Sequence, residues 1–259
     1  MCRLIAIIDP KDKKIIDSTL REFGSLAKTG TVPPGTDAGH KDGWGLAAYK
    51  NSAMIFLEKN PLDASSDQTY QTTIDKICEI NPSLILGHLR KASRGEISME
   101  NTQPYAFGQY TFCHNGTVRD FKKIILEPAY LSQRKGTTDS EVVFLYLLQT
   151  IKKNGDFLKG FLEGIKKLRS MDYTGLNILM SDGKTLLALR SANEKDAIVK
   201  DNALCDSYYT LLQGKNQEEV PLFICSQSLD IAGITWTTIP NHAVLVLDIG
   251  TQKEDLIVV

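Results

Sequence analysis

The sequence predicts an α+β protein in which two β-sheets share a core and helices lie outside them. Segments with the apolar patterns of strands occupy both ends of the chain, and helical patterns lie mainly in the middle. No segment is rich in Pro or Ser like a linker, and no repeat recurs at the period of a solenoid. We therefore expect residues 1–259 to form a single domain, although a chain of this length could also form two.

Apolar runs and turn residues place the predicted strands. Residues 3–8 form a largely apolar run that stops at Asp9-Pro10, and Ser181-Asp182-Gly183-Lys184 separates two strands as a hairpin turn. The strand from 110 to 114 breaks at Asn115-Gly116, a strong turn signal. The predicted strands are 3–8, 44–49, 53–57, 84–89, 110–114, 174–180, 186–191, 207–212, 222–226, 236–239, 243–247 and 256–259.

Periodic apolar residues place the helices. Leu20, Phe23 and Leu26 follow helical spacing, and Thr138 followed three residues later by Glu141 is a capping-box pattern that begins another helix. The predicted helices are 17–28, 66–79, 117–126, 139–148 and 155–169. Asp139 then lies in the first turn of a helix, where a carboxylate also serves simply to compensate the helix dipole.

Composition and charge exclude several classes of protein. A formal net charge of -1 leaves no electrostatic footprint for nucleic acid or for an anionic membrane. The five cysteines are odd in number and contain no C-x-x-C pair, which excludes the usual zinc and redox spacings and is typical of a reducing compartment. The N-terminal apolar run is too short for a signal peptide, and no run is long enough to span a membrane. We expect a cytoplasmic protein without a metal.

Cys2 is the first candidate for chemistry, because it stands one bond from the translation start. If Met1 is removed, Cys2 carries both a thiol nucleophile and a free α-amine, and an N-terminal amine is an established base for such a nucleophile. Its pKa of roughly 7.7 to 8.0 leaves a useful neutral fraction near pH 7. The alternative is a small apolar residue that begins a core strand.

Three other positions complete a site for such a nucleophile. Attack on a carbonyl creates an oxyanion, which Asn115 could stabilise through its side-chain amide and Gly116 through its backbone N–H. Arg90 ends a buried strand and could bind a carboxylate, while Asp139 could bind an ammonium group. Together they describe a pocket for a free amino acid with a carbonyl in its side chain, such as glutamine or another γ-glutamyl compound.

The order of these residues resembles that of the class II glutamine amidotransferases, members of the N-terminal-nucleophile hydrolase superfamily. The resemblance rests on motifs spread over essentially the whole chain. They are Met1-Cys2 with its apolar strand, Asp42-Gly43-Trp44-Gly45, Gly87 to Gly95, Asn101-Thr102-Gln103-Pro104-Tyr105, His114-Asn115-Gly116, Thr138-Asp139-Ser140-Glu141, Cys225 to Leu229 and Trp236 to Pro240.

This resemblance implies a four-layer αββα sandwich of two antiparallel sheets between helical layers. It implies that Cys2 is the nucleophile and its amine the base, that Asn115 and Gly116 form the oxyanion hole, and that Arg90 and Asp139 bind the α-carboxylate and α-amino groups. The implied reaction releases ammonia and glutamate from glutamine through a γ-glutamyl thioester. The implied substrate is a small molecule, and no cofactor or metal is implied.

The sequence also departs from the family pattern. Gln103 stands where the family usually has His in an Asn-x-His-Pro motif, and Lys91, Ser93 and Arg94 differ from the usual residues of their loop. The chain ends after the amidotransferase region, so it resembles stand-alone members. One alternative is a hydrolase of γ-glutamyl peptides or thiol metabolites that acts with a partner synthetase or peptidase subunit. The other is a catalytically silent binding module, if Met1 is retained.

Overall fold

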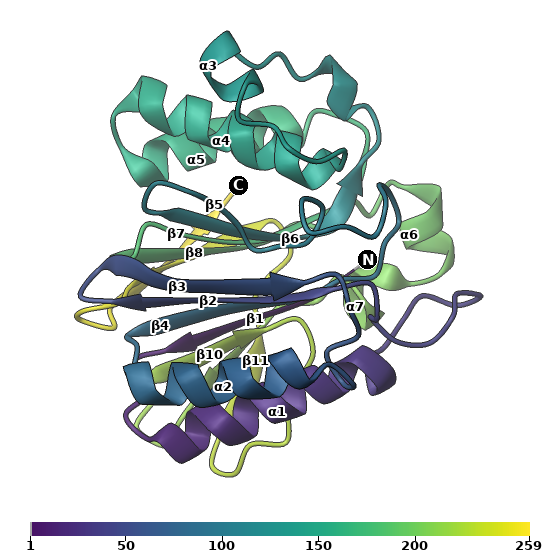
Figure 1. Cartoon of the computed structure of the whole chain (residues 1–259). Helices are drawn as coiled ribbons and strands as arrows, with labels where there is room; N and C mark the ends of the chain where they lie inside the picture. The colour runs from purple at the N-terminus through teal and green to yellow at the C-terminus, as the bar shows by residue number, and fades with distance from the viewer. Residues whose placement is uncertain (1) are drawn as a thin grey trace.

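The computed structural model describes residues 2–259. Two antiparallel sheets stack face to face between two layers of helices, as Figure 1 shows. Helices α1 (Lys13–Thr29) and α2 (Gln68–Ile80) cover one sheet, and α4 (Asp139–Asn154) and α5 (Phe157–Leu168) cover the other. The predicted α+β class and four-layer αββα arrangement are confirmed.

The seven-stranded sheet has the order β11-β9-β10-β1-β4-β2-β3. Its strands are β1 (Arg3–Ile8), β2 (Trp44–Lys50), β3 (Ala53–Asn60), β4 (Leu84–Leu89), β9 (Leu212–Lys215), β10 (Pro221–Cys225) and β11 (Thr235–Thr238). The six-stranded sheet has the order β13-β12-β8-β7-β6-β5. Its strands are β5 (Tyr105–Phe107), β6 (Tyr110–Val118), β7 (Tyr173–Ser181), β8 (Thr185–Arg190), β12 (Ala243–Asp248) and β13 (Glu254–Val258).

Three apolar clusters hold the four layers together, and strand alternation explains them. Along β1, Ile5 and Ile7 pack against α1 and α2, whereas Leu4 and Ala6 point to the other sheet, because successive side chains of a strand face opposite sides. A third cluster lies between the six-stranded sheet and helices α4 and α5. Both faces of the central strands are therefore buried, which is why β1 is apolar at nearly every position.

The residues of the predicted site lie at one end of this sandwich. Because β1 runs antiparallel to β4, with Arg3 opposite Leu89, the start of β1 lies beside the end of β4. The turn after β2 at Asn51 and the end of β1 at Asp9 lie at the far end, where they line a hollow of about 420 Å³. That larger hollow contains none of the residues predicted for catalysis.

The structure corrects two predicted elements. Asn115-Gly116 does not end a strand, because β6 continues to Val118 with a register irregularity between Gly116 and Val118. The predicted helix at 117–126 is absent, and only a short 3-10 turn, η1 (Phe121–Lys123), and α3 (Pro128–Leu131) follow. Asn-Gly favours a turn locally, but cross-strand pairing of Asn115 with Asn177 in β7 keeps this pair extended.

The predicted strand at 207–212 is also wrong. Residues 204–207 form the short helix α7 (Leu204–Ser207), which follows α6 (Ala197–Asp201), and β9 begins only at Leu212. Tyr208 and Tyr209 gave this segment its strand-like pattern, but both rings are buried against other parts of the protein. Within residues 2–259, no helix combines the length and the apolar character needed to cross a bilayer.

Candidate active site

Four elements bring the predicted site residues to one place. Cys2 precedes β1, Arg90 follows β4, Gly116 lies in β6, and Asp139 is the first residue of α4. These four residues line a single cavity. Asn115 joins them through a hydrogen bond to Cys2. The structure thus places together all five residues that the sequence nominates, although they come from distant parts of the chain.

Asn115 is the residue most directly engaged with Cys2. Its Oδ1 accepts a hydrogen bond from the backbone nitrogen of Cys2 at 2.8 Å. Its Nδ2 is fully buried and has no hydrogen-bond partner among the described residues. Buried amide donors are nearly always paired, so an unpaired one beside a thiol is a site prepared for an acceptor. The amide can hold the N-terminal residue with one atom and donate to a bound carbonyl oxygen with the other.

Gly116 lies in the same cavity and has a backbone that only glycine accommodates. Its φ is 153°, and a Cβ at this position would lie 1.8 Å from the carbonyl oxygen of Gly175 in β7. No side chain can therefore be added without moving one of the two strands.

Arg90 is 3% exposed and is held by its own loop. Its guanidinium donates to the carbonyl oxygen of Glu96 at 2.9 Å, and to those of Arg94 and Gly95 at 3.2 and 3.3 Å. The start of this loop is fixed by Asp42, whose Oδ2 accepts the N–H of Ala92 at 2.7 Å. The motif around Asp42 thus positions the residues that follow Arg90.

Asp139 is buried at the N-terminus of α4. Its Oδ2 accepts the N–H of Val118 at 2.7 Å, which ties the helix to the end of β6. Thr138 caps the helix by accepting the N–H of Glu141, as the capping pattern predicts. The Glu141 carboxylate does not return to Thr138, however, because it accepts the N–H groups of Lys135 and Gly136 instead.

The cavity among these residues measures about 20 Å³, enough for roughly one water molecule. The loop that follows Arg90, from Lys91 to Arg94, lines part of this cavity. Arg94, in the same loop, is exposed and lies over the ring of Phe121 at 5.2 Å from its centroid.

Three histidines surround this end of the protein, and burial lowers the pKa of each. His114 is neutral with a defined tautomer: its Nε2 donates to the Gly175 carbonyl at 3.2 Å and its Nδ1 accepts from Ser140 at 2.9 Å. The pKa of His40 falls to about 3 through burial and the charge of Arg3, and that of His88 falls well below its usual value through burial and the charge of Arg90.

Sequence reasoning missed Arg3, which follows the candidate nucleophile. The residue is 1% exposed, and its guanidinium donates to the carbonyl oxygens of Ser226 and Thr31. It also lies 4.6 Å from the ring centroid of Tyr208. No carboxylate in residues 2–259 pairs with it. Arg3 is therefore a buried cation next to Cys2 in the chain, held by backbone carbonyls and an aromatic ring.

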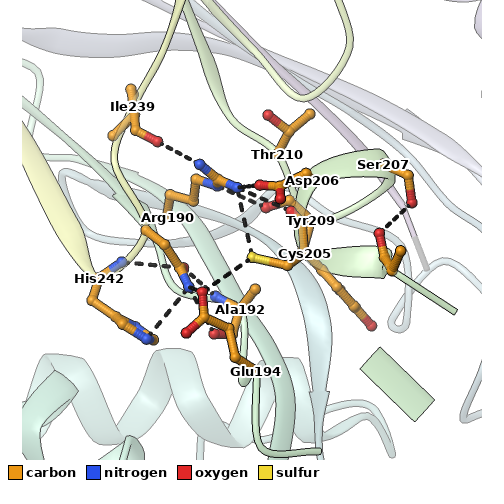
Figure 2. A network of polar contacts seen from close by, with 12 residues as sticks. Arg190, Ala192, Glu194, Cys205, Asp206, Ser207, Tyr209, Thr210, Ile239 and His242 are labelled. Atoms are coloured by element: carbon orange, nitrogen blue, oxygen red, sulfur yellow. Dashed lines mark hydrogen bonds and ion pairs between the residues drawn. The ribbon is translucent and has the colours of Figure 1, made fainter. Parts of the chain in front are cut away.

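A polar network around Arg190 holds the segment from Cys205 to Tyr209, as Figure 2 shows. Arg190, at the end of β8, donates to the carbonyl oxygens of Cys205, Tyr209 and Ile239 and pairs with Asp206 at 2.9 Å. These contacts fix α7 and the two tyrosines against the sheet. The only sequence signal for this arrangement is a lone arginine in an otherwise apolar strand.

The described residues contain no group of three or more His, Cys, Asp or Glu side chains arranged to hold a metal ion. The chemistry available at this site is that of a thiol, an amide, a guanidinium and a carboxylate.

Comparison with known proteins agrees with this geometry. The sequence pattern of the class II glutamine amidotransferases matches residues 1–210, so the chain belongs to that family. It is therefore an enzyme of the N-terminal-nucleophile hydrolase type. This confirms the family resemblance that the sequence motifs indicate.

Individual relatives are similar over part of their length. The chain is 33% identical to the uncharacterized Methanocaldococcus jannaschii protein MJ1515 over 73% of its own length and 51% of that protein. It is 30% identical to the Escherichia coli protein YafJ over 64% of its own length and 67% of that protein. YafJ carries the name "Putative glutamine amidotransferase". The chain thus spans about half to two thirds of these relatives.

A class-II glutamine aminotransferase domain protein of Silicibacter pomeroyi shares the fold. The two structures align with a TM-score of 0.62 over 99% of this chain and 98% of that one. At 18% sequence identity the likeness concerns the fold alone.

Proposed function

We propose that this protein hydrolyses the γ-carboxamide of glutamine, or of a related γ-glutamyl compound, with Cys2 as the nucleophile. The observation that carries the proposal is the environment of Asn115, whose Oδ1 holds the Cys2 nitrogen and whose buried Nδ2 has no partner in the described part of the chain. An unpaired amide donor beside a thiol is what an oxyanion requires.

In the proposed reaction, the Cys2 sulfur attacks the γ-carbonyl carbon, and its proton passes to the α-amine of the same residue. Asn115 Nδ2 and the N–H of Gly116 stabilise the oxyanion. The amine then gives the proton to the departing nitrogen, so that ammonia leaves and a γ-glutamyl thioester forms. Water hydrolyses the thioester to glutamate and restores the thiol. The freed amine retains hydrogens to donate to Asn115 Oδ1, so the contact at 2.8 Å is compatible with this base.

Arg90 and Asp139 would hold the two α-groups of the substrate. Both are nearly fully buried and line the cavity with Cys2, and their charges match a carboxylate and an ammonium. A glutamine bound between them presents its γ-amide to Cys2. We further propose that residues 1–259 act as one domain in the reducing cytoplasm, where unpaired thiols persist. The pairing of β1 with β10 and of β8 with β12 supports a single domain.

The mechanism depends on removal of Met1, a prediction that concerns a residue outside the described range. The test is release of glutamate and ammonia from glutamine by protein whose intact mass shows that it begins at Cys2. Cys2→Ala should abolish activity, while Cys78→Ala, which changes a half-buried thiol of α2, should not. Full activity in Cys2→Ala contradicts the mechanism, and endogenous protein that still carries Met1 supports a silent binding module.

A larger γ-glutamyl substrate is a second candidate, favoured by the cations near the cavity. Arg94 and Arg134 both lie over Phe121, at 5.2 and 5.9 Å from the ring centroid. These guanidiniums suit a leaving group that carries its own carboxylate. Comparing kcat/KM for glutamine with values for γ-glutamyl peptides discriminates the two, and a preference for glutamine argues against the second. Assays with the chain alone also test whether a partner synthetase or peptidase subunit is required.

A further inference from the structure

The segment from Asn101 to Gln103 lies between the two halves of the candidate site. It packs against the backbone of β2, where a Cβ on Gly45 would lie 2.3 Å from the carbonyl oxygen of Gln103. We propose that its two amide side chains are positioning residues with separate tasks: Gln103 aligns the oxyanion donor Asn115, and Asn101 aligns the loop of Arg90. This inference rests on the proposed function and adds to it a prediction of which kinetic parameter each residue controls.

Gln103 continues a strand ladder with its side chain. The main-chain pairing of β5 with β6 ends at Tyr105 opposite Phe112, and the same register places residue 103 opposite His114. The side-chain amide of Gln103 takes the place of a main-chain partner at this position. Its Oε1 accepts the N–H of His114 at 2.6 Å, and its Nε2 donates to the His114 carbonyl at 3.4 Å.

These two bonds fix the backbone immediately before Asn115. On its other side His114 pairs with Ile178 of β7, so the Gln103 amide supplies the β5-side support of β6 at this point. Gln103 is 4% exposed, and both its polar atoms are engaged with His114. Loss of the amide would leave Asn115 in place but less accurately held, and an oxyanion donor acts only when aimed at the developing charge.

Asn101 supports the opposite half of the site. Its Nδ2 donates to the Glu96 carbonyl at 3.1 Å and to Thr137 Oγ1 at 3.3 Å, and its Oδ1 accepts the N–H of Thr137 at 2.8 Å. The Glu96 carbonyl is also one of the three that hold Arg90. Asn101 therefore links the Arg90 loop to the segment that leads, two residues later, to Asp139, and these are the two residues proposed to bind the α-groups.

The matched variants are Gln103→Met and Asn101→Leu, which keep the approximate shape of each side chain and remove its hydrogen bonds. Gln103→Met should lower kcat for glutamine about 10- to 100-fold and change KM by less than about threefold, since complete loss of an oxyanion donor costs about 10²–10³. Asn101→Leu should raise KM about tenfold and leave kcat within about threefold. If the two amides served only the stability of the fold, each variant would change kcat and KM together, or would lower the fraction of active protein.

Amide hydrogen exchange provides a readout that does not depend on activity. Gln103→Met should speed exchange of the His114 N–H about tenfold and spare that of Thr137, whereas Asn101→Leu should do the reverse. If Gln103→Met does not fold, Gln103→Leu replaces it, because leucine also removes the oxygen that accepts the His114 N–H. Unchanged exchange at His114 in either Gln103 variant overturns the inference.

The kinetic outcomes separate this inference from the proposed function. If the wild-type protein releases no glutamate from any γ-glutamyl compound, the proposed function fails, and the exchange data still decide whether the two amides hold His114 and Thr137. If the wild-type protein is active but both variants change the same parameter, the function stands and the division of tasks is wrong.

Discussion

The buried histidines near the N-terminal end make a quantitative prediction about stability and pH. His40 and His88 are both fully buried, and burial lowers the pKa of each, to about 3 for His40 and well below the usual value for His88. Arg3 beside His40 and Arg90 near His88 add positive charge that acts in the same direction. In the unfolded chain each imidazole returns to a pKa of about 6.5.

The sign of the effect follows from proton binding. As the pH falls below about 6.5, the unfolded chain takes up protons that the folded protein does not, so the free energy of unfolding decreases. Each histidine whose folded-state pKa lies far below this range costs about 1.4 kcal/mol between pH 7.5 and pH 5.5. His40 and His88 together therefore account for a loss of about 3 kcal/mol, and His114 adds to it with the same sign.

Urea denaturation at pH 7.5, 6.5 and 5.5, followed by the fluorescence of Trp44 and Trp236, measures this loss. His40→Gln should reduce the difference between pH 7.5 and 5.5 by about 1.4 kcal/mol, whatever its effect on absolute stability. Carboxylates contribute little to the change between pH 7.5 and 5.5. Those with a shifted pKa, such as Asp196 and Asp248, have it lowered, which places their titration further below this range. An unfolding free energy that is flat or rises toward pH 5.5 would refute the reasoning, as would an unaltered pH dependence in His40→Gln.

Two further predictions concern the site itself. Gly116→Ala should lower kcat at least tenfold and destabilise the protein, because the new Cβ would lie 1.8 Å from the Gly175 carbonyl oxygen. Gly108→Ala is its control, since Gly108 also has a positive φ of 57° but no atom near its Cβ position, and equal losses of kcat in the two variants would count against the steric explanation. Asp139→Asn keeps an acceptor for the Val118 N–H but removes the negative charge, so KM for glutamine should rise about 10- to 100-fold with little change in urea stability. A KM equal to that of the wild type would argue that Asp139 serves only the helix.

Local sequence patterns were sufficient to predict the layers of sheets and helices in this protein. Alternation along strands such as β1 and the helical spacing of Leu20, Phe23 and Leu26 predicted which faces are buried, because both patterns depend only on the geometry of one element. The sequence also nominated the site residues correctly as neighbours, since their types and order match a known constellation. That part of the prediction depended on the chemical type of individual residues and on their order along the chain.

Long-range contacts decided the rest. Asn115-Gly116 has the local preference of a turn, yet it stays extended because β7 pairs with it across more than sixty intervening residues and leaves no space beside Gly116 for a side chain. Tyr208 resembles a strand residue, but its ring lies over Arg3 from the other end of the chain.

By itself, the sequence determined the class of fold, the family and the residues that meet around Cys2. Only the tertiary structure decided how those residues are held. Carbonyl groups of its own loop hold Arg90, and the Gln103 side chain holds the backbone of His114 immediately before Asn115. The physical reason is that a hydrogen bond between distant segments depends on the register and packing of whole sheets, which no local pattern of residues encodes.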